Sequence, residues 1–234
     1  MSSVTQDSLK EQTREFDVRV VRSVIDFCNL VPPPAQGRDV DFQAIAADAF
    51  GWLPPALRDL AEASGIEQVQ WRGDSNKQLL AAWGIALNLL HGHIGRGFPK
   101  GHLKTKFFVF DVLTLEEFLN KSLSTLPIHV RYRYTAHGVG RVELPLLTTV
   151  QRCVAYTIAL VMENRWSLSG RIKQCPFEAR DTHFGDKHFF LDYRIDAHGA
   201  FLPGEQEYCC PAHSNAHRQK RHRERSKAKP RKSK

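Results

Sequence analysis

The chain has 234 residues, with 33 basic and 25 acidic side chains and a formal net charge of +8. Hydrophobic residues make up 42%, which supplies a buried core and excludes a chain disordered throughout. The longest apolar run is interrupted by Gln151 and Arg152 and is too short to span a bilayer. The N-terminus is polar where a secretory signal would be apolar. We therefore expect a cytoplasmic protein of one or two domains without membrane contact.

The positive charge is concentrated at the C-terminal end. Residues 218–234 contain ten Lys or Arg and one acid, a local net charge of +9, whereas the first 217 residues carry 23 basic and 24 acidic groups. Such a segment attracts polyanions by releasing their condensed counterions. The charge pattern predicts a nucleic-acid partner, and a purely solubilising tail is the alternative.

Hydrophobic spacing predicts an α+β fold whose first part is mainly helical. After a flexible N-terminus (1–14), a helix from Glu15 has Phe16, Val20, Val24 and Phe27 on one apolar face and ends before Pro32–Pro34. Further helices are expected at 41–50, 56–64 and 75–91, the last capped by Ser75.

A small β insertion is expected next. Residues 104–114 and 128–138 alternate like strands, and a short helix capped by Thr114 lies between them. From Leu144, apolar residues on several faces predict a buried helix. Residues 15–165 together form the predicted N-terminal domain, to which we assign a sensor role for a small molecule or protein.

The segment from Cys175 to His217 packs three cysteines and five histidines into 43 residues. Zinc takes four N or S ligands, usually as two close pairs. The second pair is predicted to be Cys209 and His213, with Cys210 and His217 as alternates, and the first is Cys175 with His183 or, in reserve, His188. This module (166–217) has too little apolar content to fold unaided. We therefore expect one structural zinc ion per chain.

Residues from about Arg171 to Arg225 resemble the CGNR zinc-finger family. The similarity rests on RIKQC, FFLDYR, the YC dipeptide before the third ligand, and His213-Ser214-Asn215-Ala216 where the family has Cys-Gly-Asn-Arg. That family is a C-terminal module of bacterial proteins regarded as DNA-binding transcriptional regulators. The resemblance implies a zinc-ribbon-like module with Cys175, Cys209 and His213 on ligand positions.

Beyond the zinc module, a basic helix over Ser214–Lys227 followed by a disordered tail is expected. Arg218, Arg221 and Arg225 recur on one face, and such a helix fits phosphates or the major groove of DNA. The expected nucleic-acid-binding residues are Asn215, Arg218, Lys220, Arg221, Arg223, Arg225 and Lys227.

The predicted function is that of a DNA-binding transcriptional regulator without catalytic residues, associated with the nucleoid. Two alternatives are a zinc-stabilised protein-interaction module and a metal-dependent nuclease in which Asp181, Asp186 or Asp192 assists. The cysteine content favours a closed, structural site over a catalytic one.

Overall fold

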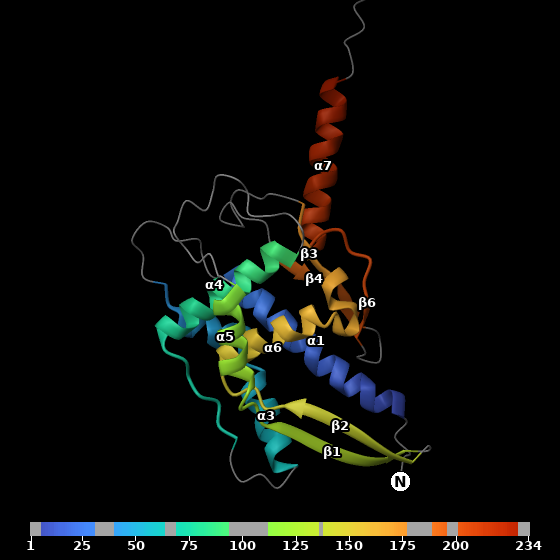
Figure 1. Ribbon diagram of the computed structural model, residues 1–234. Coiled ribbons are helices and arrows are strands. Elements are labelled where there is room, and N and C mark those ends of the chain that lie inside the picture. The colour runs from blue at the N-terminus through green and yellow to red at the C-terminus, as the bar shows by residue number, and fades with distance from the viewer. Residues whose placement is uncertain are drawn as a thin grey trace, which may run out of the picture.

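The computed structural model describes residues 6–30, 40–63, 69–93, 112–135, 138–176, 189–195 and 201–228. Within these ranges the chain is mainly helical with three small two-stranded sheets, in agreement with the mainly helical prediction (Figure 1). The helices are α1 (Gln6–Leu30), α2 (Phe42–Phe50), α3 (Leu53–Glu62), α4 (Asn76–His93), α5 (Val112–Leu123), α6 (Val150–Met162), the 3-10 helix η1 (Arg165–Gly170) and α7 (Pro211–Ala228). The strands are β1 (Ile128–Thr135), β2 (Gly138–Pro145), β3 (Ile172–Gln174), β4 (Phe189–Leu191), β5 (Tyr193–Ile195) and β6 (Phe201–Pro203). None of the described helices is long and apolar enough to cross a membrane.

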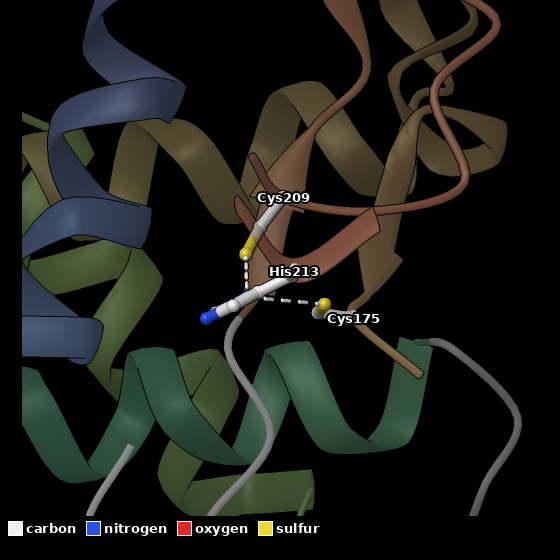
Figure 2. A group of neighbouring side chains, drawn as sticks. All are labelled: Cys175, Cys209 and His213. Atoms are coloured by element: carbon white, nitrogen blue, oxygen red, sulfur yellow. Dashed lines mark hydrogen bonds between the residues drawn. The ribbon is translucent and has the colours of Figure 1, made fainter. Parts of the chain in front are cut away.

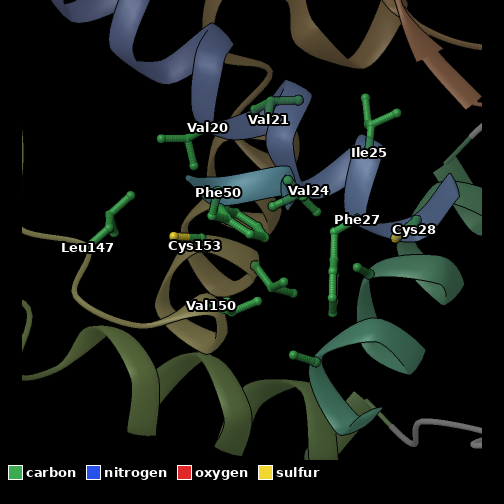
Figure 3. Close-up of a cluster of buried hydrophobic side chains, with 14 of the residues drawn as sticks. Val20, Val21, Val24, Ile25, Phe27, Cys28, Phe50, Leu147, Val150 and Cys153 are labelled. Atoms are coloured by element: carbon green, nitrogen blue, oxygen red, sulfur yellow. The ribbon is translucent and has the colours of Figure 1, made fainter. Parts of the chain in front are cut away.

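Helix α1 runs through the middle of the molecule and packs against α2, α4 and α6 (Figure 1). Val20, Val24 and Phe27 are completely buried, so the predicted apolar face is confirmed. Figure 3 shows this cluster with the buried thiols of Cys28 and Cys153. Burial raises the pKa of both thiols, as expected for cysteines that act as small hydrophobic side chains.

The first helix begins earlier than predicted. The expectation of a flexible segment over 1–14 is wrong for residues 6–14, which form the first turns of α1. Side-chain pairs one turn apart accompany this extension, with Arg14 bonded to Glu11 and Arg19 bonded to Glu15. Residues 6–14 are almost all polar and show no apolar periodicity, which is why the apolar pattern placed the start of the helix at Glu15.

The starts of α2 and α4 are fixed by side-chain caps. Asp41 accepts hydrogen bonds from the backbone N–H groups of residues 43 and 44 at the start of α2. Ser75 caps α4 as predicted, and Gln78 reaches back to the Ser75 backbone N–H at 2.8 Å. Helix α3 begins three residues before the predicted start because Pro54 and Pro55 fit its first turn.

Two predicted boundaries around the β insertion are wrong. Residues 112–114 belong to α5 and not to a strand, and Thr114 lies inside that helix; residues 104–111 of the predicted strand are outside the described residues. Strand β1 is confirmed, but its antiparallel partner is β2, with Ile128 opposite Pro145 and Thr135 opposite Gly138. Leu144 therefore lies in strand β2, which ends at Pro145, and the buried helix α6 starts at Val150 after the Thr149 cap.

The C-terminal strands pack on α1. β3 pairs with β4 and β5 pairs with β6, so the segment FFLDYR contributes to two short strands, β4 and β5, that are separated by Asp192. The Asn29 amide accepts from the Phe189 backbone N–H at 3.1 Å and donates to its carbonyl at 2.8 Å. Arg22 donates to the Tyr193 carbonyl at 3.3 Å. Both contacts fix the strands that lie beside the cysteines onto the central helix.

Candidate metal centre and the helix that leaves it

Cys175, Cys209 and His213 come together from three parts of the C-terminal region (Figure 2). Cys175 directly follows β3, Cys209 lies in the turn before α7, and His213 lies in the first turn of α7. The Nδ1 atom of His213 is 2.8 Å from the Cys209 Sγ and 3.6 Å from the Cys175 Sγ. All three donor atoms lie within 4.8 Å of one another.

This donor set fits zinc. A tetrahedral zinc ion with bonds of about 2.3 Å to sulfur and about 2.0 Å to nitrogen separates neighbouring S and N ligand atoms by about 3.5 Å. The 3.6 Å separation of Cys175 and His213 matches that value, and the 2.8 Å contact of Cys209 needs only a small outward rotation of its side chain. The three residues therefore form a possible metal site for an ion such as zinc.

The cluster is shielded from solvent. Cys175 is completely buried, His213 is 8% exposed, and Cys209 is half-buried. Burial raises the pKa of the Cys209 thiol, and the neighbouring thiols of Cys175 and Cys210 raise it further. Zinc binds cysteine as the thiolate, so an ion held by Cys175, Cys209 and His213 would displace the protons of both thiols.

A buried carboxylate braces the loop that delivers Cys209. Asp192 is completely buried and accepts hydrogen bonds from Lys173 Nζ at 2.5 Å and from the Gln206 backbone N–H at 3.0 Å. Its own backbone pairs with Arg171 on one side and Gly204 on the other. Of the three carboxylates named for the nuclease alternative, Asp192 is thus bonded to Lys173 and to the loop, and Asp181 and Asp186 lie outside the described residues.

The other proposed ligands lie in different places. His183 and His188 fall outside the described residues. Cys210 is half-buried next to Cys209 but is not a member of the close donor group. His217 contacts Tyr208, whose hydroxyl lies 2.6 Å from the His217 Nδ1 atom. That contact holds the second turn of α7 against Tyr208, in the turn that precedes the helix.

Helix α7 starts at the cluster and projects away from the rest of the chain (Figure 1). The predicted helix over Ser214–Lys227 is present and begins slightly earlier, at Pro211, which places His213 inside its first turn. Every residue from Arg218 to Glu224 is exposed, and Asn215 is exposed as well. Arg218, Lys220, Arg221 and Arg223 form no ion pair with any described residue. Positions 225 and 227 continue the same helix.

Sequence reasoning missed the residues that hold the site in place. Tyr208 and Lys173 were not singled out, and nor was Asn29 on the distant α1. The pairs that they form span 9, 19 and 160 positions, and only the fold brings these residues together. The one available signal was the short spacing between Tyr208 and His217.

No protein-family model, curated protein or solved structure matches this chain. The resemblance to the CGNR family therefore stays a prediction.

Proposed function

We propose that this protein binds double-stranded nucleic acid through α7, and that a zinc ion held by Cys175, Cys209 and His213 fixes the base of that helix. The observation that carries the proposal is the position of the metal cluster at the first turn of an exposed, cationic helix. The metal would act as a structural cross-link and the protein as a binding module with no catalytic residues. A DNA-binding transcriptional regulator in the cytoplasm, at the nucleoid, is the specific role we assign.

The metal cluster would stabilise the position of such a helix relative to the rest of the chain. An exposed helix of 18 residues extends about 27 Å and has little packing to stabilise it. An ion bound by His213 in the first turn of α7 would link the helix to β3 through Cys175 and to the preceding loop through Cys209, and so hold its direction relative to the body. A fixed direction matters because phosphate contacts set the register of a protein on its duplex.

The cations then supply affinity. Arg218 and Arg221 lie on one side of α7, and Lys220 and Arg223 lie on the other, by the 3.6-residue helical repeat. A helix in the major groove of DNA has a phosphate backbone on either side, and the groove is about 12 Å wide. Asn215 near the start of the helix is the side chain proposed to reach a base edge. The major groove of duplex RNA is too narrow for this arrangement, which is why we propose DNA.

The test is the salt dependence of DNA binding. Replacing Arg218, Lys220, Arg221 and Arg223 with Gln should lower the slope of log K against log salt by up to about 3.6, at about 0.9 for each lost phosphate contact. The matched control replaces four exposed cations of the helical body with Gln, namely Arg58, Arg72, Lys77 and Lys121. It changes the net charge equally and should keep the wild-type slope. Equal loss in both variants, or no DNA binding by the wild type, would contradict the proposal and favour a protein-interaction module.

A further inference from the structure

A cavity of about 520 Å³ opens beside the metal cluster, between α1 and the C-terminal strands. Cys209 and His213 line it from the cluster, Arg22 lines it from α1, and Phe190 and Tyr193 line it from the strands. Its size is within the range of sites that hold small organic ligands. Cys175 is completely buried and is not among the lining residues. The cavity therefore touches the cluster on the side formed by Cys209 and His213.

We infer that a metal ion in this cluster keeps one exchangeable coordination position, and that the cavity binds a small organic anion whose thiolate or carboxylate fills it. This inference rests on the metal site of the proposed function and not on nucleic-acid binding. Zinc takes four ligands, and the described residues bring three donors within reach of one ion; Cys210 lines the cavity but lies outside this close group. Because two of those three line the cavity, the remaining position faces it.

The charge of the site selects an anion. A divalent ion bound by two thiolates and one neutral imidazole has no net charge, so an anionic fourth donor leaves a charge of −1. The Arg22 guanidinium is the cation in the cavity wall that offsets it. Its hydrogen bond to the Tyr193 carbonyl fixes it at the wall. Asp26 also lines the cavity; burial raises the pKa of its carboxyl and the charge of Arg22 lowers it, so a bound anion would share the Arg22 guanidinium with Asp26.

A ligand bound there links two distant parts of the chain. One end contacts the metal at the base of α7, and the other contacts Arg22 on the central helix. Occupancy would therefore change how firmly the base of α7 is held to the body, because a ligand stabilises the arrangement that it binds best. A ligand in the cavity would therefore couple α1, through Arg22, to the base of the cationic helix α7, through Cys209 and His213.

The experiment uses the full chain loaded with Co²⁺, whose visible absorption reports its coordination, and azide as the anionic probe. We expect saturable spectral change with azide in the wild type. Arg22→Gln should weaken azide binding about fivefold, equivalent to about 1 kcal/mol. Arg22→Lys keeps the charge and should stay within about twofold of the wild type. Arg19→Gln removes an exposed cation of the same helix, paired with Glu15, and should change nothing.

A neutral probe separates charge from access. Imidazole should bind the Arg22→Gln protein as it binds the wild type, since it needs the open position but no cation. A tetrahedral Co²⁺ spectrum that neither probe alters would overturn the inference, because the chain itself would then supply the fourth ligand. That result would leave the metal site of the proposed function intact. A chain that takes up no Co²⁺ would overturn both.

Discussion

The loop before α7 depends on a glycine that has no room for a side chain. A Cβ atom on Gly204 would lie 2.2 Å from Asp192 Oδ1 and 3.1 Å from its Cγ. Asp192 has no easy way to move, because it is completely buried and is held by Lys173 and the Gln206 backbone N–H. The substitution Gly204→Ala therefore forces the carboxylate out of its hydrogen bonds.

The size of the effect follows from the bonds that are lost. A hydrogen bond to a charged group contributes about 1.5–3 kcal/mol when it is shielded, and one to a neutral donor about 1 kcal/mol. The Lys173 side chain is 38% exposed, so water replaces part of its contribution. Alanine also makes the unfolded chain less flexible, which returns about 0.4–1 kcal/mol. We expect a net destabilisation of about 2 kcal/mol for Gly204→Ala.

Urea unfolding with excess zinc measures this difference. The matched control is Gly170→Ala, where an added Cβ meets no atom within 4 Å, and it should stay within about 0.5 kcal/mol of the wild type. Because Gly204 lies on the loop that delivers Cys209, zinc affinity should also fall in Gly204→Ala and not in the control. Equal stability of the two variants would refute the role that we give Asp192.

Two further predictions concern the interior. Asn29→Ala should lower the free energy of unfolding by about 1–3 kcal/mol, at about 0.5–1.5 kcal/mol for each of the two hydrogen bonds that it removes between the Asn29 side chain and the Phe189 backbone; a loss below about 0.5 kcal/mol would contradict that link between α1 and β4. The Asp17 carboxyl should make the free energy of unfolding depend on pH. Burial raises its pKa, and the hydrogen bond from Trp166 and the charge of Arg165 offset that effect only in part. Since the folded-state pKa lies above the unfolded value, protonation of Asp17 stabilises the fold, and this contribution is lost as the pH rises through the raised pKa. The free energy of unfolding of the wild type, relative to Asp17→Asn, should therefore increase from about pH 7 to about pH 4, and a constant difference would show that Asp17 does not titrate as proposed.

Patterns with a local cause were predictable from the sequence. The apolar face of α1 and the capped start of α4 follow from spacings within one or two helical turns, and both are present. The pair Cys209 and His213 is close in space because one helical turn separates the two residues. Cys175 joins them across 38 positions, which the sequence indicated only through the ligand count that zinc needs.

Features that depend on distant partners were not predictable. Strand β2 alternates weakly, and it becomes a strand because β1 offers it a matching antiparallel register. The sequence marked Asp192 only as one of three candidate nuclease carboxylates, and its burial becomes favourable only when Lys173 lies beside it. The cavity beside the cluster likewise requires α1, whose Arg22 lies more than 150 positions before Cys175 in the sequence.

The most direct test of the account is the zinc content per chain of the full protein purified without a histidine tag, measured beside the Cys175→Ser variant. Cys175 is completely buried and provides one of the three donor atoms, so its loss removes a ligand without exposing a new surface. We expect one zinc ion per chain in the wild type and its loss in the Cys175→Ser variant. A wild-type protein without zinc, or a variant that keeps it, would contradict the metal centre on which the proposed function rests.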